Sequence, residues 1–181
     1  VVMLLLLSSC GGKQKAMGEA ITERDSLPVM TTLGVTTLIS DSGVTRYRVN
    51  TEEWMMYDRK KPSYWAFEKG VYMEQFDSIF NVEDSIKADT AYYYDKERLW
   101  KLIGNVDIQN RKGERFNTEL LYWNEATQKV YSDKFIRIQQ PDRIITGHGF
   151  DSNQQMTIYT IRNIEGIFYV DEEASSGPPQ P

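Results

Sequence analysis

The sequence predicts an all-β protein built from antiparallel strand pairs, and three observations support this fold class. Residues 86–94 are approximately repeated about thirty residues later in the segment that starts at Phe116, which is typical of a sheet built by duplication. Clusters of Gly, Asp and Asn separate short stretches rich in aromatic and β-branched residues. No segment keeps a 3.6-residue apolar period, and only residues 19–26 could form a short helix. The aligned positions are Asp89 with Glu119, Tyr92 with Tyr122, Tyr93 with Trp123, and residues 106–109 with 136–139.

The N-terminal segment resembles the end of a bacterial lipoprotein signal peptide. Residues 1–7 are apolar and lead into Leu7-Ser8-Ser9-Cys10, a sequence similar to a lipobox. The apolar run is too short to span a bilayer, although a clipped transmembrane helix or an ordinary signal peptide would give a similar pattern. We expect residues 1–9 to be a signal peptide that is incomplete at its start, and Cys10 to carry a lipid anchor.

The remaining chain divides by composition into a tether, one folded domain and a tail. Residues 10–34 are polar and small, as in a flexible tether, and residues 171–181 form an acidic, Ser/Gly/Pro-rich tail that we expect to be disordered. Residues 35–170 form the expected domain, whose size suits a single core. Its predicted strands cover residues 35–40, 44–49, 53–57, 64–67, 71–76, 86–94, 99–110, 116–123, 129–140, 144–151, 156–161 and 167–170.

Alternation along the central strands predicts one apolar inner face. Ala88, Thr90 and Thr118 are small for such a face and would leave volume between two layers. That volume could be a groove for a long apolar ligand, or it could be the taper of a packed barrel, which the residues alone favour. The predicted inner face consists of Ile86, Ala88, Thr90, Tyr92, Val106, Ile108, Phe116, Thr118, Leu120, Tyr122, Ile136 and Ile138.

Composition argues against several classes of function. The chain has a net charge of −5, so we expect no nucleic acid among its partners. One Cys and one His exclude an internal disulfide and make a His/Cys zinc site improbable, so we expect no metal and no cofactor. No nucleophile elbow, phosphate loop or zinc-protease motif occurs, and His148 between Gly147 and Gly149 is interpreted as a histidine in a turn or bulge. We therefore expect no catalytic residues and no enzyme activity.

Two kinds of motif resemble proteins of lipopolysaccharide transport. Residues 39–47 (ISDSGVTRY) and 65–72 (WAFEKGVY) are similar to the opening of the LptC family, in its Bacteroidetes-type lipoprotein form. Residues 86–91 (IKADTA) and 104–108 (GNVDI) resemble the OstA-type units of the same transport system. The resemblance covers residues 35–170. It implies an antiparallel β-jellyroll, a V-shaped sandwich of two sheets built from repeated OstA-like strand pairs.

The resemblance also implies a function and partners. Such a protein accepts lipopolysaccharide from the subunits of an inner-membrane ABC transporter and passes it along an apolar groove to a periplasmic LptA-like bridge protein. We expect a periplasmic location, with the inner membrane favoured for the lipidated Cys10. Better-known members use an N-terminal transmembrane helix instead. The alternative is a lipid-anchored structural or interaction β-sandwich without a groove. The expected edge for a partner comprises Ile158, Tyr159, Ile161 and Phe168.

Overall fold

The computed structural model describes residues 26–170. The expected signal peptide, Cys10 and the 171–181 tail lie outside the described residues. The first strand begins at Met30, inside the range that the sequence assigned to the tether, because Thr31, Thr32 and Leu33 pair with the second strand.

The structure confirms the all-β prediction. Its strands are β1 Met30–Asp41, β2 Val44–Tyr57, β3 Tyr64–Phe67, β4 Val71–Phe76, β5 Val82–Ala88, β6 Thr90–Tyr94, β7 Leu99–Gln109, β8 Arg115–Asn124, β9 Lys129–Gln139, β10 Arg143–Asn153 and β11 Tyr159–Tyr169.

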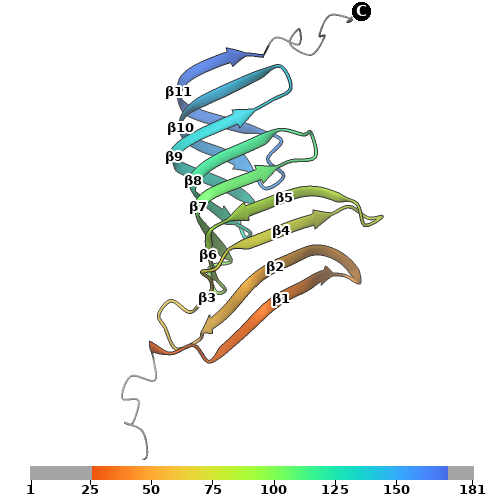
Figure 1. Cartoon of the computed structure of the whole chain (residues 1–181), viewed down its shortest axis with the longest axis vertical. Helices are drawn as coiled ribbons and strands as arrows, with labels where there is room; N and C mark the ends of the chain where they lie inside the picture. The colour runs from red at the N-terminus through yellow and green to blue at the C-terminus, as the bar shows by residue number, and fades with distance from the viewer. Residues whose placement is uncertain (1–25, 171–181) are drawn as a thin grey trace, which may run out of the picture.

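All strands belong to one antiparallel sheet that rises from β1 at one end to β11 at the other (Figure 1). From β7 to β11, each strand pairs with its predecessor in the chain. At the lower end, β2 pairs with β4 along one stretch and with β3 along another, and β7 similarly pairs with β5 and with β6. The two expected sheets are therefore two halves of a single sheet.

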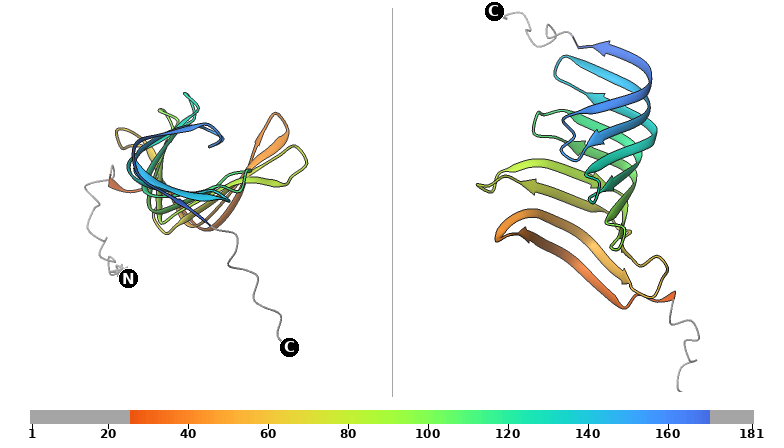
Figure 2. Two further views of the ribbon diagram at one scale, coloured as in Figure 1. Left: turned by 90° about the horizontal axis from the view of Figure 1, so that it is seen from above. Right: turned by 180° about the vertical axis from the view of Figure 1, so that it is seen from behind.

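The long strands bend, so the sheet curls into a roll whose outline is an open C when viewed along its length (Figure 2). The side chains that point into this roll form one hydrophobic core that runs from Val49 on β2 to Phe150 on β10. The described residues contain no helix that is long and apolar enough to cross a membrane.

Candidate functional site: the interior of the roll

Each long strand bends at one level of the roll, and we call this line of bends the crease. It consists of Thr51, Asp89, Gly104-Asn105, Thr118, Ser132 and Gly149. Buried positions normally recur every second residue in a strand, but across the crease from β5 to β9 they are three or four residues apart, as in Thr118 and Leu121. The pairing registers shift at the same places, which is the effect of β-bulges.

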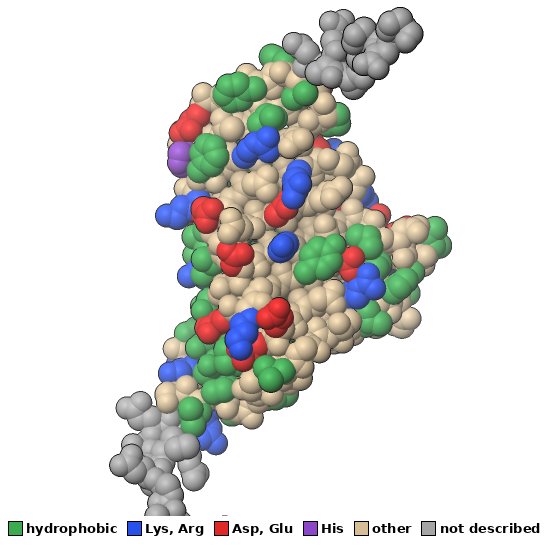
Figure 3. All heavy atoms as spheres, viewed as in Figure 1, with side chains coloured by type: hydrophobic (Ala, Val, Ile, Leu, Met, Phe, Trp, Pro, Cys, Tyr) green, Lys and Arg blue, Asp and Glu red, His purple; other side chains and the backbone are tan. Residues whose placement is uncertain are grey.

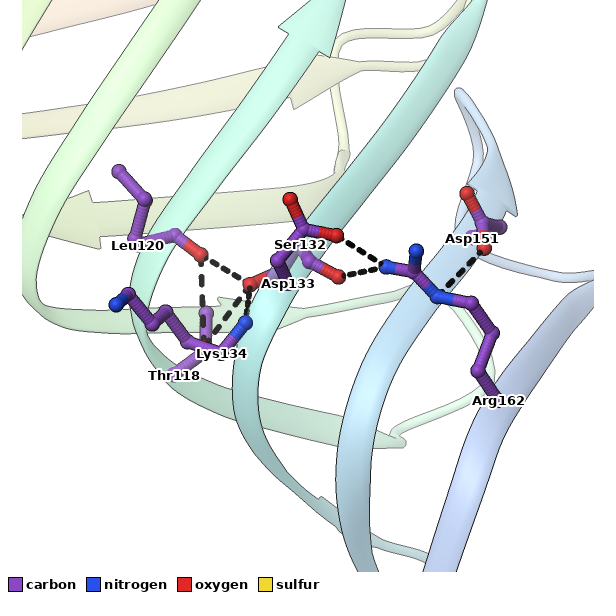
Figure 4. Close-up of polar contacts among 7 residues, drawn as sticks. All are labelled: Thr118, Leu120, Ser132, Asp133, Lys134, Asp151 and Arg162. Carbon is purple, nitrogen blue, oxygen red and sulfur yellow. Dashed lines mark hydrogen bonds and ion pairs between the residues drawn. The ribbon is translucent and has the colours of Figure 1, made fainter.

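Hydroxyl side chains replace the backbone hydrogen bonds that the bends interrupt. Thr118 Oγ1 donates to the carbonyl of Phe135 at 2.7 Å. Ser132 Oγ donates to the carbonyl of Leu120 at 2.6 Å, as Figure 4 shows. Thr51 Oγ1 donates in the same way to the carbonyl of Gly70 at 2.8 Å. Since a buried carbonyl without a partner costs about 1–3 kcal/mol, these small polar residues stabilise the bend.

Arg162 on β11 completes the crease from outside. Its Nη2 donates to the carbonyl of Ser132 at 2.6 Å and to Asp133 at 2.7 Å, and its Nε lies 3.4 Å from Asp151 (Figure 4). The guanidinium passes over Gly149, where an added Cβ would lie 2.5 Å from Arg162 Nε. Gly149 also has φ +77°, which favours glycine, so the bend in β10 requires this residue.

Because the strands bend at the crease, part of the predicted inner face was wrong. Thr90 and Tyr92, and likewise Leu120 and Tyr122, lie beyond the bend, where the alternation changes sides. Tyr92 donates to Glu68 at 2.9 Å, and burial together with Glu68 raises its pKa to about 12. These four residues therefore face outward. Thr118 faces inward but bonds to backbone, so it braces the bend rather than making room.

On one side of the crease, aliphatic side chains dominate the interior. We call this surface the isoleucine wall, and it contains most of the inner face predicted from the sequence. Phe116, Ile136 and Ile138 are completely buried in it, and Ala88 and Val106 are nearly so. The wall comprises Ile86, Ala88, Val106, Ile108, Phe116, Ile136, Ile138 and Ile145.

On the other side of the crease, the interior carries every tryptophan of the chain. We call this surface the tryptophan wall: Trp54, Trp65, Tyr93, Trp100 and Trp123. Neighbouring rings are in contact from β2 to β8, with centroids 5.1 Å apart for Trp54 and Trp65 and 4.7 Å apart for Tyr93 and Trp100. Strand alternation did not predict this wall, although the alignment of Tyr93 with Trp123 was a signal for it.

The indole groups of the tryptophan wall differ in their hydrogen bonds. Trp100 Nε1 donates to Glu125 at 2.9 Å, and Tyr93 OH donates to the same carboxylate at 3.4 Å. By contrast, the buried Nε1 atoms of Trp54 and Trp123 have no hydrogen-bond partner among the described residues. A buried donor without an acceptor costs about 1–3 kcal/mol, so these two N–H groups lower the stability of the roll.

A mainly apolar cavity of about 60 Å³ lies between the two walls. Ile86 and Ile108 contribute from the isoleucine wall, and Leu121, Trp123 and Val130 from the opposite side. Its remaining lining residues are Tyr47, Met73, Glu74, Gln75, Asp84, Ser85, Gln154 and Met156. Binding sites for small molecules usually measure ~300–1,000 Å³, so in this state the cavity is too small to hold one.

Polar groups gather at the margin of the cavity. Gln154 Nε2 donates to Tyr47 OH at 3.4 Å, and the ring of Tyr47 lies 6.1 Å from that of Trp123. Burial raises the pKa of the Asp84 carboxyl, although the backbone N–H of Arg111 donates to it at 2.9 Å. Tyr47 and Gln154, which are 107 positions apart, thus connect the two sides of the roll.

Both end strands have one free edge within the described chain, because β1 pairs only with β2 and β11 only with β10. Hydrophobic side chains are visible at both ends of the roll (Figure 3). On β1 they include Leu33 and Leu38. Of the predicted partner edge, Ile158 and Phe168 are exposed, whereas Tyr159 and Ile161 pack against the core.

His148 lies on β10 at the bulge, and its Nδ1 is 2.7 Å from Glu165 Oε1 on β11. The position agrees with the predicted bulge.

Comparison with known proteins identifies the family. No curated protein matches the chain. The family model described as lipopolysaccharide-assembly, LptC-related, matches residues 1–164, which includes both walls, the crease and the cavity. The chain therefore belongs to the LptC family and takes part in lipopolysaccharide transport.

Proposed function

We propose that the protein receives lipopolysaccharide from an inner-membrane ABC transporter and passes it through the interior of the roll to an LptA-like bridge protein. The observation that carries this proposal is the apolar cavity between the isoleucine and tryptophan walls. It lies inside a roll whose end strands both have free edges. The family's role in lipopolysaccharide assembly supports the choice of ligand.

The chemistry of the interior suits acyl chains. Exposing one methylene group to water costs ~0.8 kcal/mol, so several chains need a continuous apolar surface on their way through the periplasm. Acyl chains are joined to their headgroup by ester or amide carbonyls. The unpartnered indole N–H of Trp123 beside the cavity is a suitable donor to such a carbonyl.

The free edges support transfer between proteins. A neighbouring jellyroll can add its own edge strand to β1 or β11 by main-chain hydrogen bonds, which would join two interiors into one path. We place the transporter at β1, because the segment leading to the predicted anchor at Cys10 enters there, and the bridge protein at β11. Residues 10–25 would tether the roll to the periplasmic side of the inner membrane.

Photocrosslinking in living cells tests the path. A benzophenone side chain at Ile108 faces the cavity, whereas one at Lys101 lies on the outward face with Tyr92 and Tyr122. We expect lipopolysaccharide adducts from Ile108 and none from Lys101. Equal yields at both positions would mean that the lipid does not prefer the interior, and adducts from Lys101 alone would mean that it contacts only the outside.

A second candidate function is a lipid-anchored interaction protein whose roll stays closed. The small volume of the cavity favours it, since 60 Å³ cannot hold an acyl chain. This candidate predicts that Ile108 gives no lipid adduct, while benzophenone at Phe168 still captures a protein partner.

A further inference from the structure

We propose that the β10–β11 loop, residues 154–158, is a displaceable plug, and that Met156 occupies the place an acyl chain takes when lipid enters. The inference rests on the proposed function, because it assigns the same interior a closed and an open state. Met156 is 4% exposed, lines the cavity and belongs to the core cluster, although it comes from a loop rather than a strand.

The backbone of Met156 is in an unfavourable conformation. Its φ is +54°, in the left-handed region that residues other than glycine rarely adopt. Such a conformation persists only when its surroundings hold it, and here burial of the side chain in the cavity does so. When lipid replaces Met156, the loop can leave and the backbone can relax.

Apart from its bonds to Ser152 and Asn153 at the adjoining end of β10, the plug is attached to the rest of the roll by few bonds. Asn110 Nδ2 donates to the carbonyl of Met156 at 2.9 Å, Lys112 Nζ donates to that of Thr157 at 3.2 Å, and Gln154 reaches Tyr47. Neither the Lys112 bond nor the Gln154 bond is buried. The loop can therefore open without breaking the β10–β11 strand pairing, which runs from Ser152–Tyr159 to Arg143–Tyr169.

Asn153, the last residue of β10, holds the loop in shape from the end of the strand. Asn153 Oδ1 accepts the backbone N–H groups of Thr157 at 2.9 Å and Ile158 at 3.0 Å, and Asn153 Nδ2 donates to Thr157 Oγ1. Methionine suits this position, because its unbranched thioether fills an irregular apolar gap and leaves it with little steric resistance. Such a displacement would give a chain more room than 60 Å³ without separating the walls.

Hydrogen exchange on the full-length protein in detergent micelles, with and without purified lipopolysaccharide, tests the plug. Benzophenone at Ile108 reports occupancy of the cavity in the same samples. We expect exchange in residues 154–158 to become at least several-fold faster when lipid is captured at Ile108. Capture without faster exchange in this loop would overturn the plug and leave the proposed function intact. If benzophenone at Ile108 captures no lipid, the proposed function fails and the plug fails with it.

Two substitutions separate the plug from simple enlargement of the cavity. Met156→Ala empties the position from the loop, whereas Met73→Ala removes a similar volume from β4 and leaves the loop unchanged. We expect Met156→Ala to raise the initial rate of lipid capture several-fold more than Met73→Ala does. Equal rates would contradict the plug.

Lys112→Ala provides a check that does not depend on cavity volume. The side chain is outside the cavity lining, and its bond to Thr157 is exposed, so the variant should fold normally. We expect faster exchange in residues 154–158 and faster capture, by a smaller factor than in Met156→Ala. Unchanged values for both would count against a loop that is held by these few bonds.

Discussion

The two walls of the interior differ in what fills them and in how completely they are closed. The isoleucine wall is aliphatic, and its central residues are fully buried. The tryptophan wall is a row of large rings, and apart from Trp100 its members are only partly buried. Two of its buried indole N–H groups have no acceptor within residues 26–170. The first wall is closely packed, whereas the second carries two unsatisfied donors at a cost in stability.

This difference indicates which wall would contribute more to the affinity for a lipid. Aliphatic side chains can contact a lipid only through their apolar surface, and in the isoleucine wall that surface is already buried in the core. Aromatic rings with a polar edge offer surface and a donor together, which suits the junction between an acyl chain and its headgroup. The tryptophan wall should therefore set affinity, and the isoleucine wall should set the stability of the roll.

The largest expected effect comes from the isoleucine wall. Ile138→Ala removes a completely buried side chain between β8 and β10 and should lower the free energy of unfolding by about 2–5 kcal/mol. Urea denaturation measures the change. Ile164→Ala on the exposed part of β11 is the matched control, with an expected change within about 0.5 kcal/mol. If both variants lower the free energy of unfolding by similar amounts, the isoleucine wall is not what stabilises the roll.

An intermediate effect is expected at the crease, which separates the walls. Ser132→Ala leaves the carbonyl of Leu120 without its hydroxyl donor and should cost about 1–3 kcal/mol in the same denaturation assay. Ser40→Ala removes a hydroxyl on the exposed β1 and should be nearly neutral. If Ser132→Ala is also neutral, the hydroxyl groups do not hold the bend.

The tryptophan wall can be tested by two substitutions that each remove one indole N–H. Trp100→Phe loses the bond to the Glu125 carboxylate and should lower stability by about 1.5–3 kcal/mol. Trp123→Phe removes a donor that has no partner among the described residues, so stability should change by less than about 1 kcal/mol beyond the loss of ring size.

The same two variants should have the opposite order of effects on the yield of lipid crosslinks. We expect photocrosslinking at Ile108 to fall several-fold in Trp123→Phe and to stay near the wild-type level in Trp100→Phe. A normal yield in Trp123→Phe would show that the free N–H does not contribute to binding.

The smallest expected effect concerns alkaline pH. Burial, with Glu114 beside it, raises the pKa of Tyr159 to about 12 from an ordinary value of 10.0. The folded state then keeps a proton that the unfolded state loses, so this contribution to stability is complete below pH 10 and disappears as pH rises toward 12. Tyr159→Phe should flatten the decline in stability across this window, as measured by denaturation at several pH values. An unchanged slope would assign the decline to other tyrosines, such as Tyr92.

Sequence patterns predicted the part of the interior that obeys simple alternation. Val106 and Ile108, and their counterparts Ile136 and Ile138, were placed on the inner face because every second residue in a straight strand shares a side, and all of them are buried. The repeat and the turn signals likewise predicted β7, β8 and β9, whereas the predicted strands 44–49 and 53–57 are one strand, β2, and the predicted strands 156–161 and 167–170 are one strand, β11.

The prediction failed where a strand bends. Alternation carried across Asp89 and Glu119 put Tyr92 and Tyr122 on the wrong face, because each bend changes the spacing from two residues to three. The acidic residue at the same position of both repeats, Asp89 or Glu119, was the sequence signal for the bend. Met156 had no comparable signal, since neither its positive φ nor its burial follows from neighbouring residues.

The two free edges also constrain how such rolls can assemble. β1 and β11 are different strands at opposite ends, so contact between them is heterologous and has no two-fold axis to close it. Copies of the isolated protein at high concentration would then add end to end in open rows of unlimited length. In the cell, a different partner at each end would act as a terminator and fix the order of the components along the row.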